Sequence, residues 1–376
     1  MELSKEELNK VWLITGSTGM DSSHFFDLLL EKGYTNIHGT MRRSATFNTQ
    51  NIDHIFDKLQ LHYADLTDPM NIHNIIAKAK PDYIVHMAAQ SHVKVSHDLE
   101  NYTFQTNTLG TLSILQSVRS LGLEKTCKIY TASTSEMYGN TTDGNILLNE
   151  DSLMNPVSIY GISKKAAQEI CNMYRDAYGM FVVSSVLFNH EGPRRGHTFV
   201  TQKIADYVAK YNKNMPFGGC GSPSGKLANK SRKNHALDKI GQLQLGNLSA
   251  RRDWGSAKIY MEAVYKMLQQ EKPQNFVIAT GETHSVREFV ELAFKEINIE
   301  IVWKNTGVDE VGIKKGTEDD PEPHIIVKVN PKYFRDIDIE CLIGDSSRAR
   351  NELNWRPKYS FENLVSEMVK AAIERS

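Results

Sequence analysis

A tyrosine and a lysine spaced for proton-transfer chemistry stand in the stretch Tyr160-Gly-Ile-Ser-Lys164. Of the 15 tyrosines in the chain, only Tyr160 has a lysine four residues later. On a helix this spacing places both side chains on one face. An ammonium group beside a phenol favours the phenolate and lowers the phenol pKa from about 10 towards neutrality. The pair therefore predicts a tyrosine that acts as a general base on a hydroxyl group.

Two further reactive side chains precede this helix. Thr134 and Glu136 follow an apolar run at residues 128–133, which is typical of a buried strand. They would add a hydroxyl and a second, independent carboxylate base. Taken singly, Tyr160 could be a buried phenol beside a surface lysine, Thr134 a strand-end cap and Glu136 a solvated acid. Their placement at the end of the strand before the tyrosine helix favours a catalytic group instead.

The N-terminus supplies an element that would position a cofactor. An apolar run at residues 11–15 leads into Gly16-Ser-Thr-Gly19-Met-Asp-Ser22 and then into an apolar helical pattern. A strand, a glycine turn and a helix are typical of a dinucleotide-binding unit. Gly16 would permit the tight turn, and Gly19 would let backbone amides approach a pyrophosphate. Ser22 stands where a third glycine is expected and is small enough for close helix packing.

The next two strands carry residues that would select the nucleotide. The run at residues 36–41 is followed by Arg42-Arg43-Ser44 instead of an acidic residue. Guanidinium groups match a phosphate, so the site should prefer NADP. The alternative is a solvated basic turn, which the preceding strand and glycine turn disfavour. Asp65, after a third strand at 59–63, is placed either to accept from an adenine amino group or to cap a helix before Pro69.

Strands and helices continue to alternate along this half of the chain. A strand at 82–86 leads to Met87-Ala-Ala-Gln-Ser91, where small residues would let backbone lie against a cofactor and Gln90 and Ser91 would face a substrate. A helix at about 101–121 follows, with Leu109, Leu112, Leu115 and Val118 as its apolar stripe, and then a strand at 181–188. We predict an α/β fold, a doubly wound parallel sheet of the Rossmann type with a smaller C-terminal α/β substrate-binding domain.

The domain boundary is expected near residue 188. Residues 1–188 would form the nucleotide-binding domain, with a later contribution from about 243–262, and residues 189–376 would form mainly the substrate domain. Residues 212–237 are rich in Gly, Asn, Ser and Lys and contain no acidic residue before Asp238. This composition favours a solvated surface insertion over an anion-binding arm.

Composition excludes several other classes of protein. The formal net charge is −1, which argues against a nucleic-acid or membrane-surface protein. The four cysteines lack a Cys-x-x-Cys pair, so neither a disulfide framework nor a zinc site is expected. The first ten residues are polar and charged, and no apolar run has membrane-spanning length. A cytoplasmic protein is the expectation.

With these residues in view, the chain resembles the extended short-chain dehydrogenase/reductases, and among them the GDP-mannose 4,6-dehydratase family. The resemblance runs from about residue 11 to 374, apart from the 212–237 insertion. Beyond the glycine turn and the Tyr160/Lys164 pair, its specific motifs are Arg42-Arg-Ser44, Ser133-Thr-Ser-Glu-Met-Tyr-Gly139, Phe188-Asn-His-Glu-Gly-Pro-Arg-Arg-Gly196, Leu245-Gly-Asn-Leu248, Arg252-Asp-Trp-Gly255 and His284-Ser-Val-Arg-Glu-Phe289.

The resemblance implies a dehydration of GDP-mannose without net redox change. Tyr160 would take the proton of the sugar 4-hydroxyl while NADP accepts hydride from carbon 4, and Thr134 would hydrogen-bond the carbon 4 oxygen. Glu136 would remove the proton on carbon 5, water would leave from carbon 6, and the hydride would return there. Lys164 would hold the ribose and keep the phenol acidic. The product would be GDP-4-keto-6-deoxymannose, a precursor of GDP-fucose and related sugars.

The resemblance also assigns contact residues and an assembly. The implied cofactor contacts are Gly16, Ser17, Thr18, Gly19, Met20, Asp21, Arg42, Arg43, Ser44, Ala45, Asp65, Leu66, Met87, Ala88, Ala89, Gln90, Ser91, Tyr102, Lys164, His190 and Arg195. The implied substrate contacts are Ser91, Asn189, Glu191, Lys203, Leu245, Gly246, Arg252, Arg287 and Arg335. The arginines would bind the diphosphate through bidentate contacts. A homo-oligomer, dimer or tetramer, is implied.

The sequence departs from the family pattern in four places: Met20 for a glutamine and Ser22 for a glycine, Gly192 for a serine, a longer loop at 139–158, and the 212–237 insertion. Two alternatives remain open. One is another nucleotide-sugar enzyme on the same scaffold. An epimerase or reductase needs no base for carbon 5, so Glu136 counts against it, and a dehydratase for a dTDP- or UDP-hexose would have a neighbouring Asp-Glu pair in place of Thr-Ser-Glu136. The other is a catalytically silent NADP sensor, which would typically have lost Tyr160 or Lys164.

Overall fold

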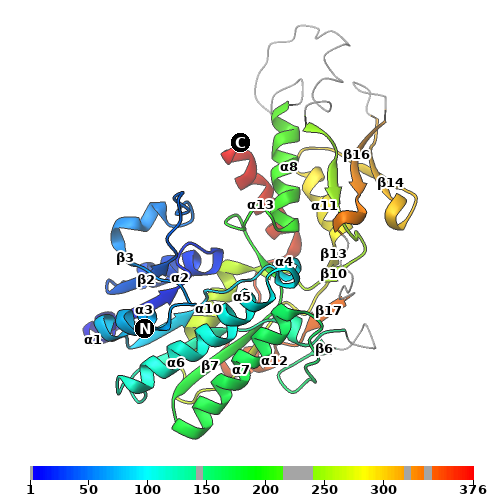
Figure 1. Cartoon of the computed structure of the whole chain (residues 1–376). Helices are drawn as coiled ribbons and strands as arrows, with labels where there is room; N and C mark the ends of the chain where they lie inside the picture. The colour runs from blue at the N-terminus through cyan, green and yellow to red at the C-terminus, as the bar shows by residue number, and fades with distance from the viewer. Residues whose placement is uncertain (1–2, 141–146, 215–239, 317–322, 334–340) are drawn as a thin grey trace. The chain divides into compact units, whose positions relative to one another are not determined.

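The computed structural model describes residues 3–140, 147–214, 240–316, 323–333 and 341–376 (Figure 1). The chain divides into two compact units. Unit 1 comprises residues 1–190, 253–282 and 341–358, and unit 2 comprises residues 191–252, 283–340 and 359–376. The sequence placed only about 243–262 as a late contribution to the nucleotide-binding domain. In the structure only residues 253–262 of that range belong to unit 1, and residues 243–252 belong to unit 2. Residues 263–282 and 341–358 also belong to unit 1, because they carry a sheet strand and a helix packed on the sheet.

Unit 1 is built on a seven-stranded parallel sheet in the order β12-β7-β5-β4-β1-β2-β3. This order confirms the predicted doubly wound Rossmann sheet. In chain order the strands are β1 (Trp12–Thr15), β2 (Ile37–Met41), β3 (Gln60–Tyr63), β4 (Tyr83–His86), β5 (Lys128–Ala132), β7 (Phe181–Leu187) and β12 (Phe276–Ile278).

Helices cover both faces of this sheet because its inner strands are buried on both sides, whereas the edge strand β3 is partly exposed. Trp12 and Ile14 of β1 join one core, whereas Leu13 between them joins the other. The first core includes α2 (Met20–Glu31), α10 (Ala257–Leu268) and α12 (Ser347–Glu352), and the second includes α3 (Pro69–Ala79), α6 (Gly110–Ser120) and α7 (Ile159–Tyr178). The ring of Trp12 stacks on that of Tyr83 at 4.0 Å between centroids.

The helix predicted at about 101–121 is continuous but not uniform. It consists of α5 (Glu100–Phe104), a π-helical turn at Gln105–Leu109, and α6. The predicted apolar stripe is wrong at Leu109, whose side chain is 46% exposed, while Leu115 and Val118 are buried as expected. A π turn holds more residues than an α turn, so the spacing that predicts one helical face does not carry across it.

Short elements complete unit 1. They are α1 (Lys5–Leu8), α4 (Val93–Asp98), β11 (Gly255–Ser256), two 3₁₀ turns at Asp53–Lys58 and Ser135–Met137, and the parallel pair β6 (Leu147–Leu148) and β17 (Cys341–Gly344). The chain leaves unit 1 at β8 (His190–Glu191).

Unit 2 contains a mixed sheet in the order β14-β15-β16-β9. Its strands are β9 (Leu243–Leu245), β14 (Ile301–Lys304), β15 (Val311–Lys314) and β16 (His324–Val329), with β9 parallel to β16 and the other pairs antiparallel. Within unit 2, β10 (Arg251–Arg252) pairs antiparallel with β13 (His284–Ser285).

Three helices of unit 2 pack on one another: α8 (Val200–Asn214), α11 (Val286–Lys295) and α13 (Phe361–Arg375). The predicted insertion at 212–237 begins too early, because residues 212–214 form the last turn of α8. The remainder of the predicted insertion, residues 215–237, lies outside the described residues.

Candidate active site

The glycine turn closes against the end of β4. Gly16 has φ +76°, and a Cβ atom on it would lie 2.9 Å from the Cα of Ala88, so a side chain is excluded by both backbone conformation and space. Gly19 is the N-cap of α2 and makes no side-chain cap, which leaves the amide groups of the first turn for an anion. This cradle fits a dinucleotide pyrophosphate.

Two sequence departures lie in this turn. Met20 is the first residue of α2 and is buried. Ser22, in place of a third glycine, is also buried, and its hydroxyl donates to the carbonyl oxygen of Thr15 at 3.3 Å. Close packing of the helix on β1 is therefore preserved, because the hydroxyl is hydrogen-bonded at the point of contact.

The arginines after β2 present exposed guanidinium groups. Arg42 donates to the hydroxyl of Tyr102 at 2.6 Å, and Arg43 lies over the ring of Tyr63 at 5.9 Å. Arg42, Arg43, Ser44 and Ala45 are all exposed. Two exposed guanidinium groups oriented by aromatic side chains fit a phosphate on the adenosine ribose.

Asp65 lies two residues after the end of β3, in a local turn. Its Oδ1 accepts from the amide and the hydroxyl of Thr67, at 2.9 and 2.8 Å. The alternative reading of Asp65 as a helix cap is wrong, because Asp68 is the N-cap of α3 and accepts from Asn71. The next residue along, Leu66, is buried.

The segment after β4 is hydrogen-bonded to a side chain of the π turn at Gln105–Leu109. Asn107 accepts from the amide of Gln90 at 2.9 Å and donates to the carbonyl oxygen of the same residue at 3.0 Å. The side chain of Gln90 donates to Thr103 and accepts from the amide of His92, so its amide group shapes the turn itself. Ser91 is exposed. The sequence analysis did not single out Asn107, because nothing in a helical pattern marks a π turn.

Thr134 and Glu136 lie directly after β5. Thr134 is buried and is the N-cap of the 3₁₀ turn at Ser135–Met137, where its hydroxyl accepts from the amide of Glu136 at 3.3 Å. Glu136 is half-buried. A Cβ atom on Gly161 would lie 2.8 Å from the carbonyl oxygen of Glu136, so this glycine lets the turn and the start of α7 meet.

Tyr160 and Lys164 belong to the first turns of α7. Ser158 is the N-cap and accepts from the amide of Gly161 at 3.0 Å, and the amide of Tyr160 donates to Ser96 at 3.2 Å. The ammonium group of Lys164 donates to the carbonyl oxygen of Ala132 at 2.7 Å. Burial lowers the pKa of Lys164 to about 8. The structure thus brings the four predicted catalytic residues to one strand end of unit 1.

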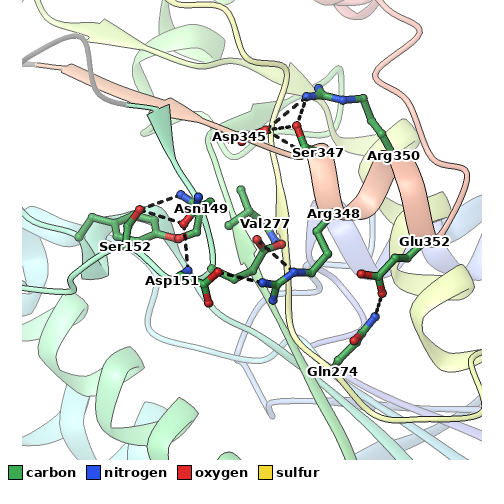
Figure 2. A network of polar contacts seen from close by, with 12 residues as sticks. Asn149, Asp151, Ser152, Gln274, Val277, Asp345, Ser347, Arg348, Arg350 and Glu352 are labelled. Atoms are coloured by element: carbon green, nitrogen blue, oxygen red, sulfur yellow. Dashed lines mark hydrogen bonds and ion pairs between the residues drawn. The ribbon is translucent and has the colours of Figure 1, made fainter.

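The loop that separates Glu136 from Tyr160 is anchored to the edge of the sheet (Figure 2). Glu150 accepts from the amide of Val277, on edge strand β12, at 2.7 Å, and Arg348 on α12 pairs with Asp151 at 3.1 Å. The hydroxyl of Tyr138 donates to the carbonyl oxygen of Asn149 at 2.6 Å. These contacts fix both ends of the described part of the long loop, and residues 141–146 lie outside it.

His190 faces the glycine turn within unit 1. Its Nδ1 lies 2.8 Å from the carbonyl oxygen of Phe188, and its Nε2 lies 3.0 Å from a carboxylate oxygen of Asp21. Both partners are acceptors when the carboxylate is ionised, so the ring is placed to carry a proton on each nitrogen. Asn189 holds the adjacent backbone, because its carbonyl oxygen accepts from Gly255 at 2.9 Å.

Unit 2 holds the other predicted contact residues, several of them already in polar contacts. Glu191 is buried, accepts from Thr201 at 2.7 Å and pairs with Arg195 at 3.0 Å. Arg287 pairs with the buried carboxylate of Glu310 at 2.6 Å. The sequence analysis missed Glu310, an acid that orients an arginine from 23 residues away.

The remaining predicted substrate contacts are placed as follows. The ammonium group of Lys203 donates to the carbonyl oxygen of Gln244 at 2.6 Å and lies 3.8 Å over the ring of Tyr333. Gly246 faces the same tyrosine, whose carbonyl oxygen would lie 2.7 Å from a Cβ on the glycine. Leu245 and Arg252 are buried. Arg335 lies outside the described residues.

Neither a metal centre nor a membrane span is found in the part of the chain that the structure describes. No group of three or more His, Cys, Asp or Glu side chains there could hold a metal ion. No helix among the same residues is long and apolar enough to cross a membrane.

Comparisons with known proteins agree on one family. A family model described as GDP-mannose 4,6 dehydratase matches residues 13–221 and 224–368. The chain is 46% identical to a GDP-mannose 4,6 dehydratase of Drosophila melanogaster, over 97% of this chain and 87% of that protein. It is 43% identical to one of Homo sapiens, over 97% of this chain and 91% of that protein.

A solved structure shares the fold. The structure of RMD from Pseudomonas aeruginosa complexed with NADPH has a TM-score of 0.70 and 18% sequence identity to this chain. The match covers 98% of this chain and 100% of that one. At this identity the match supports the architecture of the two units and nothing finer.

Proposed function

The chain belongs to the GDP-mannose 4,6-dehydratase family of the extended short-chain dehydrogenase/reductases, and we propose that its reaction is carried out by four side chains of unit 1: Thr134, Glu136, Tyr160 and Lys164. It is a hydro-lyase that converts GDP-mannose to GDP-4-keto-6-deoxymannose and water and uses NADP as its cofactor. The alternative of another nucleotide-sugar enzyme is thereby set aside.

The observation that carries the assignment of roles is the junction of β5 with α7. The carbonyl oxygen of Glu136 lies against Gly161, next to Tyr160, and Lys164 reaches back to Ala132. These contacts support a site at the end of β5 to which Glu136 would bring a carboxylate and Tyr160 a phenol. Two bases there suit a reaction that removes two protons from neighbouring carbon and oxygen atoms of one sugar.

Each residue then has one task. The phenolic oxygen of Tyr160 takes the proton of the 4-hydroxyl, and the hydroxyl of Thr134 donates a hydrogen bond to the carbon 4 oxygen. The carboxylate of Glu136 removes the proton on carbon 5, which the 4-ketone has acidified. Bound NADP supplies the acceptor for hydride from carbon 4 and the donor that returns it to carbon 6. The ammonium group of Lys164 favours the phenolate of Tyr160.

The cofactor contacts proposed for unit 1 rest on the cradle and the basic turn. The first turn of α2 offers its amide groups to the pyrophosphate, and Arg42 and Arg43 offer guanidinium groups to the ribose phosphate. The full set proposed is that of the sequence analysis, from Gly16 to Asp21, Arg42 to Ala45, Asp65, Leu66, Met87 to Ser91, Tyr102, Lys164, His190 and Arg195.

For the GDP moiety we propose the positions named from the sequence. Arg252 and Arg287 bind the diphosphate, and Lys203, Leu245 and Gly246 contact the nucleoside. Support comes from the flat ring of Tyr333 under the ammonium group of Lys203 and from the guanidinium group of Arg287, which Glu310 orients. Asn189, Glu191, Ser91 and Arg335 complete the proposed set.

We also propose that the chain is a homo-oligomer of the cytoplasm. Four large apolar side chains on α5, the π turn and α7 are between 39% and 46% exposed: Phe104, Leu109, Ile162 and Met173. A second copy of the chain would cover them. Light scattering measures the mass of the assembly, and Ile162→Lys should reduce it by placing a charge in the proposed interface. An unchanged mass would show that α7 is not part of the interface.

The activity is tested by incubating the purified protein with GDP-mannose and catalytic NADP⁺ and following the sugar nucleotide by mass spectrometry. Loss of one water per sugar without accumulation of NADPH is expected. No loss of water from GDP-mannose, with turnover of a UDP- or dTDP-hexose, would contradict the substrate. Tight NADP binding with no turnover of any of these would identify a silent sensor.

A further inference from the structure

A buried histidine stands between the cofactor turn and the helical layer. His86 is the last residue of β4, is only 3% exposed, and lies beside Thr15 at the end of β1. The side chain is buried too deeply to be proposed as a contact of substrate or cofactor. Its two ring nitrogens nevertheless have partners on opposite sides.

The first partner fixes the hydrogen on Nε2. This nitrogen lies 3.2 Å from the hydroxyl oxygen of Thr111, on α6. The hydroxyl of Thr111 already donates its one hydrogen to the carbonyl oxygen of Asn107, at 2.7 Å. Thr111 can therefore only accept from the imidazole, so Nε2 of His86 carries a hydrogen.

The second partner fixes the state of Nδ1. This nitrogen lies 2.8 Å from the hydroxyl oxygen of Thr15. That oxygen accepts from the amides of Met87 and Ala88, at 3.2 and 3.1 Å, which uses both of its lone pairs. The hydroxyl of Thr15 must then donate to Nδ1, so Nδ1 carries no hydrogen and the ring is neutral.

The surroundings support the neutral ring. Burial, and to a smaller extent the charge of Lys164, lower the pKa of His86 to about 3. A second proton on Nδ1 would compete with the amides of Met87 and Ala88 for the oxygen of Thr15. The neutral imidazole and the backbone conformation at 87–88 therefore require each other.

The consequence reaches the cofactor cradle. Ala88 is the residue that meets Gly16, where no Cβ atom would fit. The amide of Ala88 is held by Thr15, the residue before Gly16, and the orientation of the Thr15 hydroxyl is set by His86. We propose that His86 is a positioning residue which, as the neutral imidazole with its hydrogen on Nε2, fixes the backbone of Met87 and Ala88 against the cofactor turn through the hydroxyl of Thr15.

This inference rests on the cofactor role proposed for residues 87–91, but its first test does not need the cofactor. Histidine ¹⁵N spectra of the protein without ligand, with His86→Asn used to assign the signal, report which nitrogen carries hydrogen. Between about pH 6 and pH 8 a neutral ring that carries its hydrogen on Nε2 is expected, because this range lies well above the pKa of about 3. A ring protonated at Nδ1, or at both nitrogens, would overturn the proposal.

The second test compares two buried threonines at strand ends. Thr15→Val removes the hydroxyl that accepts from the amides of Met87 and Ala88. Thr131→Val, the control, removes a hydroxyl of β5 that lies 2.7 Å from the hydroxyl of Ser184 on β7. Both lose a buried hydrogen bond. Only Thr15→Val should speed amide hydrogen exchange at Met87 and Ala88, and only it should weaken NADPH binding, by roughly tenfold or more. Equal effects of the two variants on exchange and on NADPH binding would contradict the proposal, because His86 and Thr15 would then only stabilise the fold.

The third test is a graded rescue at His86. In His86→Asn the side-chain oxygen can still accept from the hydroxyl of Thr15, although the hydrogen bond to Thr111 is lost. In His86→Leu both hydrogen bonds are lost. NADPH affinity should stay within about threefold of the parent protein in His86→Asn and fall roughly tenfold in His86→Leu. Equal losses would contradict the role of the Thr15 contact. If the parent protein itself binds no NADPH, the cofactor proposal fails, and the ¹⁵N and exchange results still decide the role of His86.

Discussion

The ammonium group of Lys164 donates to the carbonyl oxygen of Ala132 at 2.7 Å, and this contact ties α7 to the end of β5. The two elements that carry the proposed catalytic residues of unit 1 are thereby joined by the side chain that lies one helical turn from Tyr160. Because Lys164 is buried, the fold favours its neutral form, and burial lowers its pKa from the ordinary 10.5 to about 8. Its charge is then sensitive to pH in the alkaline range.

This shift predicts how the stability of the cofactor-free protein depends on pH. Between about pH 8 and pH 10.5 the unfolded chain holds the lysine proton and the folded protein has released it. The unfolded state binds more protons, so the free energy of unfolding should rise with pH through this window, by at most roughly 3 kcal/mol, and should be flat below it.

Urea unfolding at several pH values, with Lys164→Met as the reference, isolates the contribution. Subtracting the variant removes the opposite trend of the tyrosines Tyr83, Tyr130 and Tyr138, whose pKa values burial raises. A difference between the two proteins that stays constant from pH 7 to pH 10, a range chosen to span the window, would contradict a perturbed Lys164.

Replacement of the proposed carbon 5 base separates folding from chemistry. Glu136→Gln keeps the size of the side chain and removes its basicity, so dehydration should fall by about 10²- to 10⁴-fold while NADPH binding is retained. Exchange of the carbon 5 hydrogen with solvent should be lost with it. Glu100→Gln, an exposed acid on α5, is the control. Full activity in Glu136→Gln would assign the base to another residue.

The basic turn after β2 should set nucleotide preference. Arg43→Ala removes an exposed guanidinium group placed for the ribose phosphate, so affinity for NADPH should fall about 10- to 100-fold while affinity for NADH is little changed. Isothermal titration with both nucleotides measures this. Lys58→Ala removes an exposed cation from the 3₁₀ turn that precedes β3 and should leave the ratio unaltered. An unchanged ratio in Arg43→Ala would refute the phosphate contact.

A buried carboxylate in the Arg252-Asp-Trp motif should matter for stability. Asp253 accepts from the amide and hydroxyl of Thr280, at 2.8 and 2.6 Å, and from the amides of Gly281 and Gly344, at 2.9 and 3.2 Å. Asp253→Asn would turn an amide NH₂ group towards N–H donors or towards the threonine. The free energy of unfolding should drop by roughly 2–4 kcal/mol.

Chemical denaturation checks this value. Asp57→Asn, on an exposed 3₁₀ turn of the same unit, should change stability by less than about 0.5 kcal/mol. Equal stabilities of Asp253→Asn and the parent protein would show that the four hydrogen bonds contribute nothing net.

Six of the seven strands of the unit 1 sheet could be predicted from the sequence, because they fall in short runs separated by helical patterns of a different period. The seventh, β12, lies beyond the predicted boundary near residue 188 and joins the sheet by pairing with β7. Gly16, Thr134 and Lys164 could also be placed from local spacing, since each lies at the junction of a strand and a helix. The NADP preference followed from Arg42 and Arg43, whose position after β2 has a direct chemical meaning.

Other features depend on contacts between distant segments and left no local pattern. The π turn at Gln105–Leu109 moved Leu109 out of the predicted stripe. Residues 341–358 joined unit 1 through tertiary packing alone. Glu310 and His86 gained their partners from segments 23 and 71 residues away, and no spacing rule connects such positions.

We propose that Tyr160 and Glu136 direct an internal transfer of hydrogen from carbon 4 to carbon 6 of one sugar. The most direct measurement uses GDP-mannose with deuterium at carbon 4, incubated with the purified protein and unlabelled NADP⁺, and locates the label by NMR. A dehydrated 4-keto product with deuterium at carbon 6 is expected. A dehydrated product without deuterium at carbon 6, or deuterium that accumulates in the nucleotide, would contradict it.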